Sequence, residues 1–324
     1  MEQLWNNYGT TMEQPFNHHG TRQRRMELFF NSVTRLYHIF FVLLQLYNRQ
    51  QDMKRIDIEL IIRNKAPQLH RKLPRFAIGF MKWLVCQKQL NEILENCEMY
   101  EGPDFAIAMS KYMNVTYSVQ GLEKIKDDGH YLMVSNHPLG AYDGISYIAV
   151  LGKKIPGLKI VVNDILMNID QLRCMFLPVN TVGRQKRSDM EAIERAYRDE
   201  NIQMMSFPAG FCSRFIDGKI QDIAWKKSVI TKAIDSKRDV IPMYFKGRNS
   251  MVFYGLEWFR RILGIKFNIG LILLPWQMAR YARGKHYTIV IGDPIPYQTF
   301  DASRSHTEWA QWLREQCYNL KKNS

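Results

Sequence analysis

The sequence predicts an α/β fold in which a mixed sheet is flanked by helices, with a helical extension on its N-terminal side. Short apolar runs alternate with helical segments between residues 116 and 300. Residues 56–115 have a mostly helical composition, interrupted near Pro67, Pro74 and Pro103. Alternating strands and helices are typical of α/β sheets. A chain of 324 residues is long enough for one large domain with such an extension.

The first predicted region is a flexible basic arm over residues 1–27. It is rich in Asn, Gln, Thr and Gly, and a basic run over residues 21–25 lies near its end. Met26 follows this run and is an alternative start of the chain. The arm has no apolar h-region, so it does not predict a signal peptide.

The second predicted region is a helical membrane-associating region over residues 28–115. Apolar residues recur at helical spacing over residues 28–47, but the uninterrupted apolar run covers only residues 39–44. A spanning helix needs roughly 20 apolar residues. Two interpretations remain open: an amphipathic helix lying in the membrane interface beside the basic run, or a helix packed on the domain.

The third region, residues 116–300, contains the predicted sheet, and residues 301–324 form a C-terminal helical region. The predicted strands cover residues 131–134, 159–162, 202–207, 240–245 and 286–291. The predicted helices cover residues 143–151, 188–199, 225–236 and 306–320, and we expect Ser188 to cap the second of them.

The charge balance indicates an anionic partner. There are 45 Lys and Arg residues against 31 Asp and Glu, a net charge of +14. Nucleic acid, anionic lipid head groups and an acidic carrier protein all fit such a surface. The sequence has no zinc-finger spacing, RNA-binding aromatic signature or helix-turn-helix pattern, so we do not predict nucleic-acid binding. The 17 Phe, 16 Tyr, 7 Trp and 17 Met suit a lipid surface at least as well as bases.

The cysteines indicate a reducing compartment. Their number, five, is odd and no two form a CxxC pair, so neither a disulfide framework nor a metal site is predicted.

The most informative segment for chemistry is residues 134–144. A predicted strand ends near Ser135, a helix begins near Asp143, and the intervening turn contains His137. Catalytic groups collect at such strand ends. If the turn brings the two side chains together, the carboxylate holds one imidazole nitrogen while the other accepts a proton from an alcohol. The alternative interpretation is an ordinary turn histidine beside a helix-capping aspartate.

A second segment, residues 206–214, also follows a predicted strand. Pro208 and Gly210 shape a tight turn, and Ser213 and Arg214 can converge with backbone N–H groups on a phosphate or carboxylate. The alternative is a solvated loop with a surface arginine.

The two segments together resemble the glycerolipid (1-acylglycerol-3-phosphate type) acyltransferase family. Asn136, His137 and Asp143 match its first block, with five residues between His and Asp where the family usually has four. Phe207, Pro208 and Gly210 match its third block. Ser213 and Arg214 follow in altered order, and Ala209 replaces a Glu.

Further blocks occur in the family's order. Residues 176–180 with Arg184 resemble the acceptor-binding block, Pro242 lies in a strand, and residues 291–296 resemble the closing segment. The form of the first block resembles the bacterial hemolysin-like or aminolipid branch. The resemblance implies His137 and Asp143 as catalytic residues. It also implies substrate-binding residues, namely Asn136, Gly140, Asn180, Arg184, Phe207, Pro208, Gly210, Ser213 and Arg214.

The resemblance implies an acyltransferase in membrane lipid biosynthesis. The acceptor would be the hydroxyl of a lysophospholipid-type or lyso-aminolipid molecule, and the donor an acyl carrier protein or coenzyme A thioester. No cofactor or metal is implied. The expected place is the cytoplasmic face of the inner membrane, peripheral or monotopic. Acylation of an amine and a non-catalytic lipid-surface protein of the same fold remain alternatives.

The segment from Trp258 to Trp276 has two interpretations. It is largely apolar, and Arg260, Arg261 and Lys266 lie within it. Trp and cations beside an apolar stretch fit contact with a membrane, and a core element under the sheet fits about as well.

Overall fold

The structure is a computed structural model, and it describes residues 55–65, 67–163, 166–167, 169–179, 186–262 and 270–323. The basic arm over residues 1–27 and the predicted helix over residues 28–47 lie outside the described residues.

The described chain begins with helices, as predicted. They are α2 (Ile58–Lys65), α3 (Pro67–Lys72), α4 (Arg75–Leu84), α5 (Gln87–Asn96) and α6 (Gly102–Tyr112). Pro67 opens α3, Pro74 precedes α4, and Pro103 lies in the first turn of α6. Proline is well tolerated in these places because the first helical N–H groups have no partner within the helix.

The strands and later helices alternate, which confirms the predicted α/β class. The strands are β1 (Thr116–Gln120), β2 (Tyr131–Ser135), β3 (Leu158–Asn163), β4 (Phe176–Val179), β5 (Gln203–Ser206), β6 (Arg214–Ile216), β7 (Lys219–Gln221), β8 (Asp239–Lys246) and β9 (His286–Ile291). The helices are α7 (Ala141–Leu151), α8 (Arg187–Arg198), α9 (Ser228–Asp235), α10 (Met251–Ile262), α11 (Gly270–Trp276) and α12 (His306–Asn319). Short helical segments are η2 (Leu122–Lys124), η4 (Asp170–Met175), η5 (Gln277–Tyr281), η6 (Tyr297–Thr299) and η7 (Leu320–Asn323).

One expectation within these elements is wrong. Helix α8 begins at Arg187, so Ser188 lies inside the helix, and Lys186 occupies the N-cap position without a side-chain cap. A well-formed cap is found instead at α12, where the Ser305 hydroxyl accepts from the Glu308 N–H and the Glu308 side chain accepts from the Ser305 N–H.

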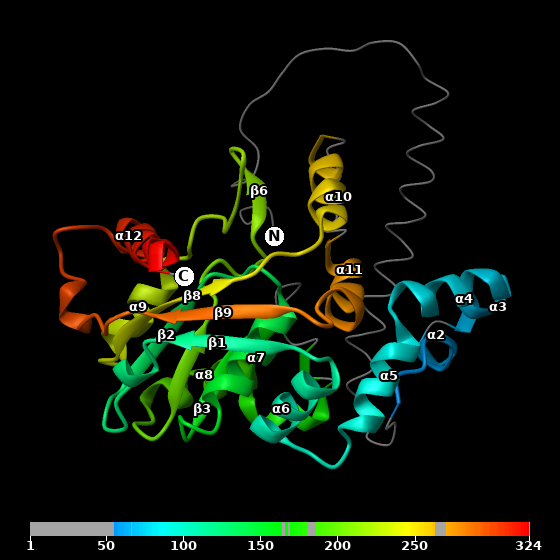
Figure 1. The fold of residues 1–324 in the computed structure, drawn as a ribbon, viewed down its shortest axis with the longest axis horizontal. Helices are drawn as coiled ribbons and strands as arrows, with labels where there is room; N and C mark the ends of the chain where they lie inside the picture. Colours follow the sequence, from blue (N-terminus) through cyan, green and yellow to red (C-terminus); the bar gives the residue numbers. More distant parts are fainter. Residues whose placement is uncertain are drawn as a thin grey trace, which may run out of the picture. The chain divides into compact units, whose positions relative to one another are not determined.

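The seven-stranded sheet has the order β1-β9-β8-β2-β5-β3-β4 (Figure 1). Strands β8, β2, β5, β3 and β4 run parallel, and β9 pairs antiparallel with β8. Strand β1 follows the direction of β9. The sheet is therefore mixed, as predicted. A separate two-stranded hairpin is formed by β6 and β7.

Each face of the sheet packs against its own apolar layer. In β2, Tyr131 and Met133 join the cluster that contains residues of α5, α6 and α7, while Leu132 and Val134 join the cluster that contains residues of α8, α9 and α12. Successive strand residues point to opposite faces. Because both faces are covered, β2 is buried along its whole length.

No described helix combines the length and the apolar character needed to cross a bilayer.

Candidate active site

The sheet order brings together two segments that are far apart in the sequence. Strand β2 lies between β5 and β8, and all three run in the same direction. Their carboxyl ends therefore meet at one edge of the sheet, the usual place for ligands in such folds. His137 lies two residues after β2, and Phe207 directly follows β5.

The turn after β2 places His137 beside Asp143. Gly140 has a φ of +77° and directly precedes α7, so Asp143 lies in the first turn of that helix. Nδ1 of His137 is 3.1 Å from Oδ1 of Asp143. The five intervening residues are thus accommodated by a turn followed by the start of a helix, and the predicted pair forms despite the longer spacing.

The Asp143 carboxylate is fixed by the backbone around it. Oδ2 accepts from the Leu139 N–H at 3.0 Å, and Oδ1 accepts from the Gly144 N–H at 3.1 Å. The carboxylate is completely buried. The partial positive charge at a helix N-terminus also favours an anion there. The orientation of Asp143 is therefore set before any substrate binds.

The imidazole of His137 is held between this carboxylate and an aromatic ring. It stacks on Phe207, with ring centroids 4.2 Å apart and an interplanar angle of 28°. The His137 side chain is 17% exposed. Because Nδ1 lies beside the Asp143 carboxylate, Nε2 is the ring nitrogen left to exchange a proton with a substrate.

Opposing effects act on the pKa of His137. Burial lowers the pKa of the imidazole and is the largest single effect, but the carboxylates of Asp143 and Asp222 together outweigh it. The pKa of His137 therefore lies above its ordinary value of 6.5.

Asn136 serves the fold at this edge. Its Nδ2 donates to the Phe245 carbonyl at 3.0 Å, and its Oδ1 accepts from the Phe245 N–H at 2.7 Å. The Asn136 side chain thereby links the end of β2 to the backbone of β8. The Asn136 side chain is buried, and it contributes to the site by holding the ends of β2 and β8 together.

The loop that follows β5 is bonded directly to the turn that contains His137. The Gly210 N–H donates to the Phe207 carbonyl at 2.9 Å, and Gly210 has a φ of +69°, so the chain turns tightly after Pro208. The Ser213 N–H then donates to the His137 carbonyl at 2.8 Å. Both predicted segments thus form one unit.

Ser213 and Arg214 differ in what they can offer a ligand. Ser213 is 1% exposed, and its hydroxyl donates to Oδ1 of Asp222 at 2.6 Å. Arg214 forms an ion pair with Glu257, which also lies 3.1 Å from Nε of Arg260. Arg214 keeps further guanidinium N–H donors beside this ion pair and its side chain is 13% exposed, so of the two residues it is the better suited to bind an anion.

Ala209 and Cys212 limit the chemistry of this loop. Ala209, which stands where the family carries Glu, is completely buried in the apolar cluster that contains Trp225, so a carboxylate there would be desolvated. Burial raises the pKa of the Cys212 thiol to about 12. Cys212 is therefore protonated at neutral pH and unsuited to act as a nucleophile.

Asp222 is a buried residue of the site that the sequence did not single out. Besides Ser213, its carboxylate accepts from the backbone N–H of His137 at 3.2 Å and from Nε1 of Trp225 at 3.0 Å. Burial raises the pKa of Asp222. It lies just beyond the β6–β7 hairpin, and no motif or periodicity in the sequence marks it as a neighbour of His137.

Two predicted site residues, Asn180 and Arg184, lie outside the described residues.

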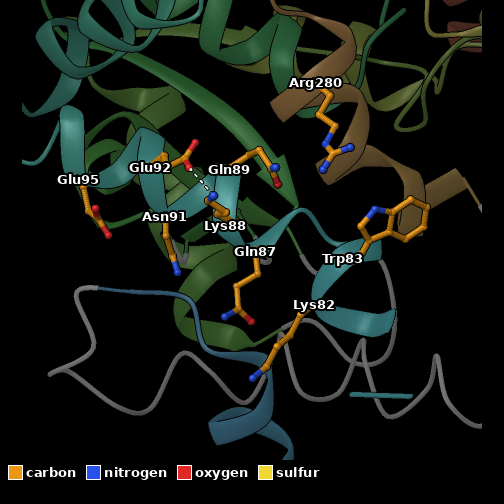
Figure 2. Close-up of a pocket in the computed structure, with 9 residues that line it drawn as sticks. All are labelled: Lys82, Trp83, Gln87, Lys88, Gln89, Asn91, Glu92, Glu95 and Arg280. Carbon is orange, nitrogen blue, oxygen red and sulfur yellow. Dashed lines mark ion pairs between the residues drawn. The ribbon is translucent and has the colours of Figure 1, made fainter. Parts of the chain in front are cut away.

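A surface groove lies elsewhere, between α4, α5 and η5. Its lining is mostly polar and includes Trp83, Arg280 and the ion pair of Lys88 with Glu92, whose atoms are 3.9 Å apart (Figure 2). Neither His137 nor Asp143 lines it. The groove is therefore distinct from the candidate active site.

The chain is similar to known acyltransferases. Residues 60–324 match the family described as Acyltransferase. A lyso-glycine lipid O-acyltransferase from Phocaeicola vulgatus is 40% identical over 266 residues, covering 82% of this chain and 95% of that protein. The protein of the same name from Bacteroides thetaiotaomicron is 40% identical over 266 residues, covering 82% of this chain and 97% of that protein. The crystal structure of the 1-acyl-sn-glycerophosphate acyltransferase from Thermotoga maritima is 16% identical, with a TM-score of 0.41, over 86% of this chain and 95% of that one.

Proposed function

The chain belongs to the acyltransferase family, and on this premise we propose that it transfers a fatty acyl group from a thioester to the hydroxyl of a lyso-aminolipid. The observation that carries the proposal is the pairing of His137 with Asp143 at 3.1 Å, at the carboxyl edge of three parallel strands. A lyso-glycine lipid is the first acceptor to test, because two relatives at 40% identity bear that name.

In the proposed reaction, Nε2 of His137 accepts the proton of the acceptor hydroxyl as its oxygen attacks the thioester carbonyl. A C–O bond forms and the carbonyl oxygen takes up negative charge. When the carbonyl re-forms, the C–S bond breaks, and the imidazolium returns its proton to the departing thiolate. Asp143 stabilises the imidazolium through Nδ1. The hydroxyl of the acceptor is itself the nucleophile, so no acyl-enzyme intermediate is needed.

Two parts of the site assist this reaction in the proposal. Backbone N–H groups near Gly140 steady the oxyanion; removing one such donor typically costs about 3 kcal/mol of transition-state stabilisation. Arg214, held by Glu257, attracts the anionic head group of the acceptor. A carboxylate-bearing lipid suits a guanidinium at this position.

The donor and the place of action complete the proposal. Acyl carrier protein and coenzyme A thioesters are both anionic, and the chain carries a net charge of +14. We place the protein at the cytoplasmic face of a bacterial inner membrane, bound peripherally, because an acceptor with a fatty acyl chain partitions into a bilayer.

The test compares lipid extracts from cells that express the wild type with extracts from cells that express His137→Ala. We expect a diacylated aminolipid to accumulate only with the wild type, and its head group to identify the acceptor. Purified protein supplied with each donor in turn then distinguishes acyl carrier protein from coenzyme A. If both extracts contain the same lipids while both proteins are folded, the non-catalytic alternative is favoured.

A further inference from the structure

Helix α10 exposes an apolar face to solvent. Six of its side chains are large, apolar and exposed, and two of them, Trp258 and Ile262, are 57% and 60% exposed. We call these six the α10 face: Met251, Val252, Leu256, Trp258, Phe259 and Ile262.

The burial pattern of α10 is the reverse of that of an ordinary surface helix. At 100° per residue, the α10 face and the exposed Gly255 occupy one continuous arc. Phe253, Tyr254 and Glu257 point the opposite way and are buried. Among the α10 side chains that the structure describes, none on the exposed arc is charged. A helix that turned this face to water alone would present polar residues instead.

The charged side chains of α10 that the structure describes form ion pairs within the protein. Glu257 is 4% exposed and pairs with Arg214 and Arg260, whose side chains are 13% and 16% exposed. The helix thus directs its described charged groups, with Phe253 and Tyr254, towards the protein interior, and the six apolar side chains of the α10 face outward.

Further exposed apolar and cationic side chains lie on the segments that adjoin α10. Strand β6 contacts α10 and carries Phe215, which is 44% exposed (Figure 1). Lys246 and Arg248 are exposed just before α10 begins, and Lys219 is exposed on β7. Cations beside exposed aromatic and aliphatic side chains complement a surface that is apolar within and anionic at its boundary.

The same helix is attached to the catalytic turn. Nδ2 of Asn249 donates to the Pro138 carbonyl at 2.9 Å, and Asn249 lies two residues before α10. The Asn249 bond joins the segment before α10 to the turn that contains His137, and the Glu257 ion pair joins α10 to Arg214. A molecule that contacts α10 is therefore close to His137.

We infer that the α10 face, together with Phe215, is the surface on which the protein docks to an anionic lipid bilayer, so that the acceptor reaches His137 from the membrane. The inference rests on the proposed function, since a lipid acceptor explains why such a surface adjoins the site. A bilayer fits better than a protein partner because, among the described side chains of the exposed arc, only the indole N–H of Trp258 is a conventional hydrogen-bonding group, whereas protein interfaces carry about one hydrogen bond per 100–200 Å². Docking by one helical face and a basic margin is typical of interfacial helices.

The test uses the full chain and a triple variant, Val252→Ser with Trp258→Gln and Phe259→Ser. The matched control is Met99→Gln with Tyr100→Gln and Met190→Gln, which replaces three other exposed large side chains. Co-sedimentation is measured with vesicles of phosphatidylglycerol and phosphatidylethanolamine, and with vesicles of phosphatidylcholine alone. Acyl transfer is measured in parallel on an acceptor dispersed in detergent and on one embedded in vesicles.

We expect the α10 variant to bind the anionic vesicles at least about tenfold more weakly than the wild type, while the control binds normally. Wild-type binding should also be weaker to phosphatidylcholine. Transfer to the vesicle-embedded acceptor should fall with binding, and transfer to the detergent-dispersed acceptor should stay unchanged. Vesicle binding is measured without acyl transfer. If the wild type transferred no acyl group, the proposed function would be refuted, and the vesicle-binding result would still test the docking surface.

Three outcomes would overturn the inference. Unchanged vesicle binding by the α10 variant would show that another surface docks. A change from dimer to monomer, with vesicle binding retained, would show that a second copy covers the α10 face. A large fall in melting temperature, absent from the control, would show that another part of this chain covers it.

Discussion

The turn that follows β2 and the helix that follows β8 begin at neighbouring strand ends, yet they distribute polar and apolar groups in opposite ways. The turn encloses His137 and Asp143 and surrounds them with backbone donors. Helix α10 buries Glu257 and exposes the six apolar side chains of the α10 face. The first arrangement fixes charges for proton transfer in a partly dry site. The second suits contact with a medium that is itself apolar.

This contrast separates two kinds of change. A substitution in the turn should reduce transfer to any acceptor, whereas a substitution on the α10 face should matter only where the acceptor is in a bilayer. Four substitutions in and around the turn, taken in order of decreasing effect, test this contrast, with the Met99, Tyr100 and Met190 control variant as the reference for folding.

The largest effect is expected from His137→Ala. General bases contribute about 10²–10⁴-fold to rate, so kcat/KM for the detergent-dispersed acceptor should fall by about that factor. The side chain is small and partly exposed, so the melting temperature should change little. Activity within tenfold of the wild type would remove His137 from the mechanism.

The second effect is expected from Asp143→Asn, with kcat/KM about 10²-fold lower at neutral pH. The transfer step needs a neutral imidazole, so kcat/KM should fall at acid pH as His137 becomes protonated. In the wild type, the midpoint of this acid limb of the pH profile should lie above the ordinary pKa of 6.5, because Asp143 and Asp222 raise the pKa of His137. Removing the Asp143 charge should move this limb to lower pH. A pH profile of kcat/KM measures it, and a limb that stayed in place would disconnect Asp143 from His137.

The third effect concerns the backbone of the turn. A Cβ at Gly140 would lie 2.8 Å from Sγ of Cys212 and 2.9 Å from Cδ2 of Leu274. Gly218 also has a positive φ, but a Cβ there would meet nothing within 4 Å. Gly218→Ala should therefore cost only the strain of its backbone conformation, while Gly140→Ala should cost about 1–3 kcal/mol more through overpacking. Denaturant unfolding measures both, and equal losses would contradict the close packing of the turn.

The smallest effect is expected from Asp222→Asn. Removing this charge should shift the acid limb of the pH profile downward by less than Asp143→Asn does, because Asp222 is the lesser of the two contributions to the pKa of His137. We expect kcat/KM at neutral pH to fall about tenfold or less, since the His137 amide loses a charged acceptor. A merely structural role would leave the acid limb unmoved.

A control distinguishes the charge of Asp222 from its hydrogen bonds. In Asp222→Asn, the new NH₂ group faces Nε1–H of Trp225 if the amide oxygen keeps Ser213 and His137. Trp225→Phe removes that donor. A double-mutant cycle should therefore show that Trp225→Phe costs less stability in the Asp222→Asn variant than in the wild type, while the shift of the acid limb persists.

Much of the fold could be predicted because its signals are local. Buried strands such as Val240–Phe245 and helical segments such as Asp143–Leu151 can be recognised from their composition. Both elements occur where they were expected. Strands β1, β4, β6 and β7 were not predicted. Residues Thr116–Gln120 alternate between exposed and part-buried and form an edge strand, which lacks the strongly apolar run that revealed the central strands.

The sequence predicted which residues belong to the candidate site, but not how most of their side chains contact one another. The sequence identified His137, Asp143 and the loop of Phe207 because each follows a recognisable strand. It interpreted Ser213 as an anion-binding residue, and the structure directs the Ser213 hydroxyl to Asp222 instead. Such a bond depends on how the β6–β7 hairpin folds back, which no local pattern encodes.

The sequence by itself therefore determined the alternation of the central strands with helices, the basic charge, and the His137–Asp143 motif with its family resemblance. Tertiary structure decided the rest: the stacking of Phe207 on His137, the burial of Asp222, and the outward face of α10. An apolar residue has the same identity in a core or on a surface, so the segment from Trp258 allowed both interpretations. Only the packing of the other elements determines which apolar side chains remain uncovered, because burial is a property of neighbours in space and not of neighbours in sequence.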